Sequence, residues 1–170
     1  LRSSDKGFLG HTGLKLTRNW PGPCLYKDLL IEGFNIGIDI AHFEYGNTFE
    51  NINLRHQLKY GLVNKQNMVA ILTLSSENSV PAIFASDTNG LTVVVNGKFT
   101  GGAADSAAVT GVGELYLRDI QTGGYGKAVH TERKGAEDLP AVNGKADIGL
   151  YVTEKFAMGT EDSSPLRLPI

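Results

Sequence analysis

The chain has 170 residues and a mass of 18.3 kDa, which predicts a single domain because a second independent core would leave too few residues for either. Hydrophobic residues make up 41% and charged residues 20%, so the chain can bury a core and is not a disordered polar tract. The formal net charge is -2 and the basic residues are scattered, which disfavours nucleic acid as a partner. The longest apolar stretches fall far short of the roughly 20 residues of a membrane-spanning helix, so no membrane partner is expected.

Cysteine and the first residues say little about the compartment. The single cysteine, Cys24, excludes an intrachain disulfide and Cys-based zinc patterns. The chain begins with Leu1 and has no charged segment followed by an apolar one, so no signal peptide is expected within it. Because the first full repeat starts near Gly13 without an obvious cap before it, we expect the chain to be a piece of something longer.

A short apolar string that opens with a small residue recurs along the chain. Its bulky or branched residues are spaced by 20 to 26 positions, with an average of about 23, which is typical of one supersecondary unit per repeat. These residues are Leu14, Ile38, Leu62, Ile83, Val109 and Val129.

A second apolar string lies between successive copies of the first, at 29–31, 52–54, 72–74, 93–95 and 115–117. Aligned on their last residues, these strings keep intervals of 20 to 23. Segments rich in Gly, Asn or Asp follow most of them, as a chain that turns at each corner requires. Two independent strings that keep one period indicate a real repeat.

The period and the short strings predict an all-β fold, a parallel β-helix of about six coils over residues 1–130. The sequence lacks the pattern that leucine-rich repeats require, and a hairpin meander would need more two-residue turns than it contains. Residues 131–170 are expected to form a C-terminal cap strand near 148–152 and an extended tail that includes 160–165.

Alternation along the short strands predicts which side chains are buried. We expect the apolar residues of the first strings to stack inward; these are Leu14, Leu16, Ile38, Ile40 and Leu62. The residues between them, Lys15, Asp39 and Val63, are expected to face outward.

Two segments resemble coils of the right-handed parallel β-helix proteins of the pectate-lyase-like superfamily: 27–38, Lys-Asp-Leu-Leu-Ile-Glu-Gly-Phe-Asn-Ile-Gly-Ile, and 48–52, Thr-Phe-Glu-Asn-Ile. The resemblance implies that the predicted β-helix is right-handed. The resemblance covers roughly residues 10–130, and segments 20–23 and 123–128 are similar to bacterial secreted members. It implies a carbohydrate-active protein, polysaccharide lyase-like or glycoside hydrolase-like, as an enzyme or a fragment without a full catalytic site. It also implies an extracellular or periplasmic location. The alternative is a non-catalytic carbohydrate-binding or structural module, such as a tailspike-like rod.

The catalytic motifs of that superfamily do not occur in this sequence. The Asn-x-Asp, Asp-Asp and Gly-His-Gly motifs of its hydrolases are missing, and so is a dense acid cluster with Arg, as in its lyases. Whether the chain is an enzyme is therefore left open.

If the resemblance holds, Asp39 with His42 or Glu44 forms the best catalytic pair, with a solvated strand face as the alternative interpretation. Arg55 with His56 and Arg118 with Asp119 occupy matching places in the coil order, where they could bind sugar hydroxyls or carboxylates. Turn residues that cap the coil backbone are the alternative for both pairs.

Phe84 is predicted outward and could stack on a sugar face, as could Tyr45, Tyr60 and Tyr125, although each ring could also fill a coil corner. Lys127, His130 and Arg133 form a small basic cluster. The four histidines fall in different coils, so no metal site is expected, and no cofactor motif occurs. The expected partners are a polysaccharide or oligosaccharide, with missing coils or other domains of a longer chain.

Overall fold

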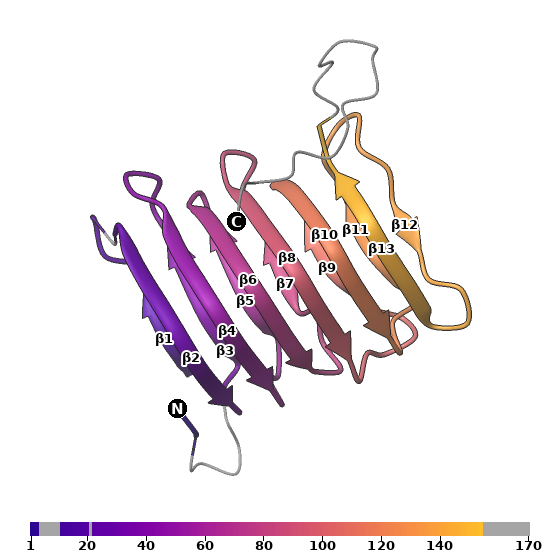
Figure 1. Ribbon diagram of the computed structural model, residues 1–170, viewed down its shortest axis with the longest axis horizontal. Coiled ribbons are helices and arrows are strands. Elements are labelled where there is room, and N and C mark those ends of the chain that lie inside the picture. Colours follow the sequence, from indigo (N-terminus) through magenta and orange to yellow (C-terminus); the bar gives the residue numbers. More distant parts are fainter. Residues whose placement is uncertain (4–10, 21, 155–170) are drawn as a thin grey trace, which may run out of the picture.

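The computed structural model describes residues 1–3, 11–20 and 22–154 of the chain, and they form a parallel β-helix (Figure 1). Each coil contributes one short strand to a seven-stranded sheet and one long strand to a six-stranded sheet. The described part holds no helix that could cross a membrane. Five coils are complete and a sixth is begun, close to the number expected from the repeat.

The short strands have three to six residues and pair in parallel from one coil to the next. They are β1 (Thr12–Leu16), β3 (Ile36–Ala41), β5 (Tyr60–Lys65), β7 (Ile83–Ala85), β9 (Ala107–Gly111) and β11 (Lys127–Thr131). The ladder joins the bulky residues in the alignment expected from the sequence: Leu14, Ile38, Leu62, Ile83, Val109 and Val129.

The long strands have nine or ten residues and also pair in parallel. They are β2 (Cys24–Glu32), β4 (Asn47–Arg55), β6 (Met68–Glu77), β8 (Leu91–Thr100) and β10 (Glu114–Gly123). Here the expected alignment is correct only for the first step, in which Ile31 lies beside Leu54. Leu54 then lies beside Ser76, not Leu74, so at this step the apolar strings are two residues out of register, and at the last step, where Val95 lies beside Arg118, one residue.

The cause of that slip is a column of left-handed residues in the middle of the long strands. One residue per coil has a φ between 54° and 64°, and all occupy the same position in the ladder: Asp28, Asn51, Thr73, Asn96 and Asp119. Each interrupts the alternation of its strand, so apolar residues on both sides of it can be buried. Asn51 donates to Asp28 at 2.7 Å and Asn96 to Thr73 at 3.1 Å, which links the column from coil to coil.

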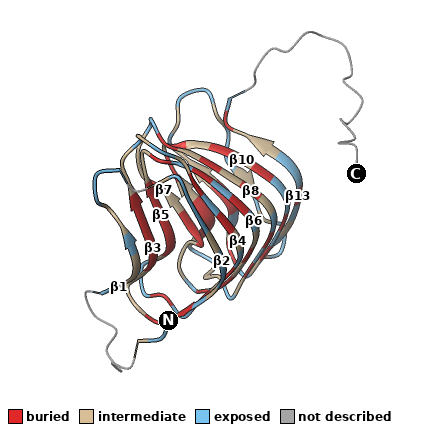
Figure 2. Cartoon of the chain, turned by 60° about the vertical axis from the view of Figure 1, so that its left-hand side comes forward, coloured by how far each residue is buried: buried red, intermediate tan, exposed pale blue. Residues whose placement is uncertain are grey.

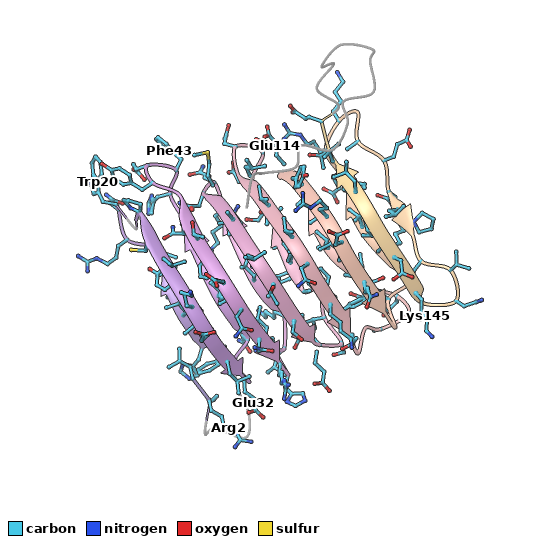
Figure 3. The ribbon with its side chains drawn as sticks, in the orientation of Figure 1. Arg2, Trp20, Glu32, Phe43, Glu114 and Lys145 are labelled. Atoms are coloured by element: carbon cyan, nitrogen blue, oxygen red, sulfur yellow. The ribbon has the colours of Figure 1, made fainter. Side chains whose placement is uncertain are left out.

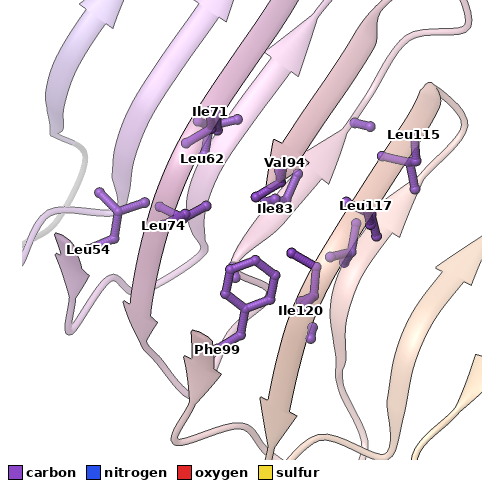
Figure 4. Packing of buried hydrophobic residues seen from close by; sticks show 14 of the residues in the cluster. Leu54, Leu62, Ile71, Leu74, Ile83, Val94, Phe99, Leu115, Leu117 and Ile120 are labelled. Atoms are coloured by element: carbon purple, nitrogen blue, oxygen red, sulfur yellow. The ribbon is translucent and has the colours of Figure 1, made fainter. Parts of the chain in front are cut away.

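The core lies between the two sheets (Figure 2). Leu62 and Ile83 of the short strands meet Ile71, Val94 and other residues of the long strands, and all four are at most 2% exposed (Figure 4). Burial of this continuous stack, at about 25 cal/mol per Å² of apolar surface, is the main stabilising contribution to the fold.

The outward residues of the short strands are not all solvated. Asp39 is 5% exposed and Val63 3%, which corrects the expected solvated face at these positions. Lys65 lies over the Asp39 carboxylate, and the stacked rings of Tyr60 and Phe84 lie on the same side of the sheet as Val63. A second layer of side chains therefore covers this face.

The C-terminal end of the helix is closed by strands that run against the coils. Strand β12 (Leu139–Pro140) pairs antiparallel with β11, and β13 (Lys145–Val152) pairs antiparallel with β10. The strand expected at 148–152 lies within β13. The extended tail expected from 160–165 lies outside the described residues.

Candidate functional site

The three residues expected to be catalytic lie close in sequence, yet Asp39 and His42 each have a structural partner elsewhere in the chain. Asp39 forms an ion pair with Lys65, whose Nζ lies 2.7 Å from Oδ1 and 3.0 Å from Oδ2. His42 donates from Nε2 to the carbonyl of Thr17 at 3.0 Å. Within the described residues, no hydrogen bond or ion pair joins any two of Asp39, His42 and Glu44.

The two basic pairs proposed to bind sugar are at different positions in the coil, which corrects the expected match. Arg55 lies beside Glu32 and Glu77, at the end of the long strands, while Arg118 lies beside Val95, before the left-handed column. His56 Nδ1 is 3.7 Å from Glu32, and Arg118 Nε is 3.6 Å from the neighbouring Asp119. The four side chains therefore cannot contact one ring of a ligand together.

The aromatic residues proposed for stacking divide into three environments. Phe84 stacks on Tyr60 with 4.6 Å between ring centroids. Tyr125 is fully buried, which excludes it as a surface ring, and its hydroxyl donates to the carbonyls of Asn78 and Val80. Burial raises the pKa of Tyr125 to about 12. Tyr45 is 41% exposed and pairs with the ring of Trp20.

A polar strip runs across the outer face of β8, β10 and β13. We define it as Asn96, Lys98, Asp119, Gln121 and Asp147, all of them exposed. The ladder places Lys98 beside Gln121 and Gln121 beside Asp147, so an ammonium, an amide and a carboxylate form one line. Neighbouring members of this line are about 4.8 Å apart, the spacing between strands.

Two shallow hollows meet on the polar strip. One has a volume of about 430 Å³ and includes Asn96 and Asp119; the other has about 320 Å³ and includes Thr100 and Lys145. Lys98, Gln121 and Asp147 line both. The surface is open and offers hydrogen-bond donors and acceptors side by side, which suits a ligand with many hydroxyl groups.

Of the strip, the sequence indicated only Asp119. Lys98, Gln121 and Asp147 are separated by 23 and 26 positions in the chain and form no motif. The repeat period would have placed Lys98 beside Gln121, but Asp147 comes from an antiparallel strand outside the repeat.

The basic cluster expected at Lys127, His130 and Arg133 is neutralised by acids. Asp138 accepts from Lys127 Nζ at 2.7 Å, from the backbone N–H of Thr131 at 2.8 Å and from His130 Nδ1 at 2.9 Å. These donors, Lys127 first, hold the pKa of Asp138 well below its usual range. Arg133 is bound by carboxylates as well: Glu114, at 2.8 Å, and Glu154. The cluster therefore fixes the cap to the last coils, and the sequence did not identify Asp138 as its centre.

No group of three or more His, Cys, Asp or Glu side chains within the described ranges could hold a metal ion. No known family model matches the chain, and no curated protein or solved structure matches it either. The fold and the geometry of its surface are therefore what bears on function.

Proposed function

We propose that this chain is a carbohydrate-binding β-helix that holds a polysaccharide or oligosaccharide on the polar strip. The observation that carries the proposal is the line of Lys98, Gln121 and Asp147 across three strands, shared by both hollows. A sugar hydroxyl both donates and accepts hydrogen bonds. In this line the ammonium donates, the carboxylate accepts and the amide between them does both, so a hydroxyl can find a donor and an acceptor side by side. Because all three side chains are exposed, binding removes little charge from water and is expected to be weak per sugar.

The resemblance of the coils to the pectate-lyase-like superfamily supports the same function and a secreted or periplasmic location. The parallel β-helix itself is compatible with carbohydrate-active and structural modules. An extended ligand suits a rod whose surface repeats every coil, because each added sugar can meet similar neighbours.

The test is binding to a panel of plant, algal and bacterial polysaccharides, by glycan array and then by calorimetry. We expect Gln121→Ala to weaken binding about fivefold, because a single exposed hydrogen-bonding group contributes about 1 kcal/mol. Asn53→Ala is the matched control, since Asn53 occupies the same column of the sheet two strands before Lys98 and outside both hollows. Equal effects of the two substitutions, or no binding at all, would contradict the proposal.

One observation favours a second function, glycoside hydrolysis. Asp119 and Asp147 line the same hollow, and Asp147 lies opposite the residue two positions after Asp119. The Cα atoms of such diagonal neighbours are about 7 to 8 Å apart, which allows their carboxyl groups to reach the roughly 6.5 to 9.5 Å separation of inverting hydrolases. An assay for new reducing ends, run with one for unsaturated lyase products, decides the matter. Turnover by the native protein that is lost in Asp119→Asn would make the strip an active site.

A further inference from the structure

Three aromatic side chains gather at the corner that joins short to long strands in the first two coils. Trp20 is 66% exposed, Phe43 67% and Tyr45 41%, although rings of this size usually bury most of their surface. Trp20 and Phe43 lie along the same edge of the molecule in Figure 3. We call Trp20, Phe43, Glu44 and Tyr45 the aromatic corner.

The rings of Trp20 and Tyr45 form a pair that is open to solvent. Their centroids are 5.7 Å apart and their planes are inclined by 45°. Two tilted rings at this distance leave their outer faces available to a third planar or ring-shaped group.

Hydrogen bonds from a buried side chain and close backbone packing hold the backbone of this corner in place. Asn67, which is fully buried, donates from Nδ2 to the carbonyls of His42 at 2.6 Å and Tyr45 at 2.7 Å. A Cβ at Gly22 would lie 2.9 Å from the Gly46 carbonyl, so successive corner loops pack closely against each other. A ligand therefore meets backbone that is already ordered, which lowers the entropic cost of binding.

The corner also holds a carboxylate oxygen without a donor. Oε2 of Glu44 is shielded from solvent and accepts no hydrogen bond from the residues described. A shielded carboxylate oxygen of this kind is costly unless a donor reaches it, and a ligand hydroxyl that displaces the atoms covering it would be such a donor.

We infer that the aromatic corner is a second sugar-binding subsite, in which a pyranose ring stacks on Trp20 and Tyr45 and donates a hydroxyl to Glu44. The inference rests on the proposed function. A sugar fits this surface better than a purely apolar partner does, because its C–H face suits the rings and its hydroxyls suit the carboxylate. The corner lies in coils one and two and the polar strip in the last coils, so a long oligosaccharide that reaches both would gain by multivalency.

The chain contains one tryptophan, so its fluorescence reports on the corner alone. The probes are hexasaccharides of β-1,4-glucan, β-1,3-glucan and α-1,4-galacturonan, each titrated by calorimetry and by Trp20 fluorescence with acrylamide as quencher. We expect the hexasaccharide that binds to protect Trp20 from acrylamide, with the same dissociation constant by both methods. Trp20→Ala and Tyr45→Ala should each weaken binding about fivefold to tenfold, while Trp20→Phe keeps a stacking ring and should weaken it less than threefold.

Tyr116→Ala is the matched control, because Tyr116 is a half-buried ring on β10 away from the corner. If a hexasaccharide binds and Gln121→Ala weakens it, but Trp20 stays open to acrylamide and Trp20→Ala has no effect, the inference is overturned and the proposed function stands. Loss of binding in Trp20→Ala but not in Gln121→Ala supports the corner and removes the strip. Binding of none of the three probes overturns the inference for these sugars. A dimer in analytical ultracentrifugation that Trp20→Ala dissociates would show that a second copy covers the corner, and would also overturn it.

Discussion

The two ends of the β-helix are built differently. In the first coil, the inward side chains of Leu14, Leu16, Tyr26 and Leu29 are only partly buried. Their equivalents one coil later, Ile38, Ile40, Phe49 and Ile52, are at most 1% exposed. At the other end the last coils are fully packed: Tyr125 is 0% exposed and Ile148 of the cap is 4% exposed.

The difference comes from strand direction. Strands β12 and β13 run antiparallel to the coils, so they take up the free edges of β11 and β10. At the first coil, the described residues before β1 pair with the long-strand sheet only where Arg2 lies beside Glu32, in parallel. A parallel strand continues a solenoid, while an antiparallel strand from outside the repeat ends it.

The largest effect on stability is expected from removing the buried ring of Tyr125 in the last coils. Tyr125→Ala deletes a buried ring and its hydrogen bonds to Asn78 and Val80, and should lower the free energy of unfolding by about 4 kcal/mol. Tyr26→Ala, in the first coil, should lower it by roughly half as much because Tyr26 is partly exposed. Urea denaturation of both variants measures the difference. Equal losses would mean that the two ends are packed alike in solution.

A matched pair of leucines sharpens the comparison within one column of the short-strand sheet. Leu62 is 0% exposed in the third coil, while Leu14 occupies the same column in the first coil and is partly exposed. We expect Leu62→Ala to cost about 3 kcal/mol and Leu14→Ala about 1 kcal/mol. Thermal unfolding followed by circular dichroism measures both losses, and a larger loss for Leu14 would contradict the looser packing of the first coil.

The left-handed column offers a stabilising substitution in the middle of the rod. Thr73 has a φ of 64°, which is unfavourable for a β-branched residue, and the neighbouring coils carry Asn51 and Asn96 at this position. Thr73→Asn should therefore raise the free energy of unfolding by about 1 kcal/mol. Thr48→Asn, on an exposed and regular part of β4, is the control and should not stabilise. An unchanged or lower melting temperature for Thr73→Asn would argue against strain at this position.

The smallest effect on stability is expected from protonation of Asp138, whose carboxylate holds the C-terminal cap. The pKa of Asp138 is lower in the folded protein than in the unfolded chain, because Lys127, Thr131 and His130 donate to its carboxylate. Its stabilising contribution is therefore full above the unfolded pKa of about 3.9 and is lost as the pH falls below that value. Since the side chain is partly exposed, Asp138→Asn should cost at most about 1 kcal/mol near pH 7, and this cost should decrease as the pH falls below about 3.9. Urea denaturation of both proteins between pH 2 and 7 should show the difference between the two stabilities narrow toward pH 2. A difference that does not narrow in acid would mean that the carboxylate charge does not hold the cap.

The short strands could be predicted with their register, because a small residue followed by a branched one marks the same position in every coil. The long strands could not, since apolar strings such as 72–74 and 93–95 extend across or up to the left-handed column, and nothing in them shows which residue points inward. Val94 is buried and pairs with Leu117, although the alignment by last residues had placed Val95 there.

The surface sites were harder to predict than the strands, because residues that are adjacent on the surface come from distant positions in the chain. The burial of Asp39 depends on Lys65, which is 26 positions later in the chain. The polar strip needs Asp147 from the cap, and the aromatic corner needs Trp20 and Tyr45 from different coils. Local sequence patterns identify the repeat, while these contacts depend on how the coils and the cap stack on one another in three dimensions.

The regular register has a consequence for how this chain tolerates changes in length. Deleting residues 62–82 would join Gly61 to Ile83, which occupies the column position of Leu62, so the two halves of the rod would meet in matching rows. Deleting a single residue within β5 would instead turn the rest of that strand over and place its apolar side chains in water. Insertions and deletions are thus compatible with this architecture chiefly in whole coils, which makes the coil the natural unit for lengthening or shortening the protein.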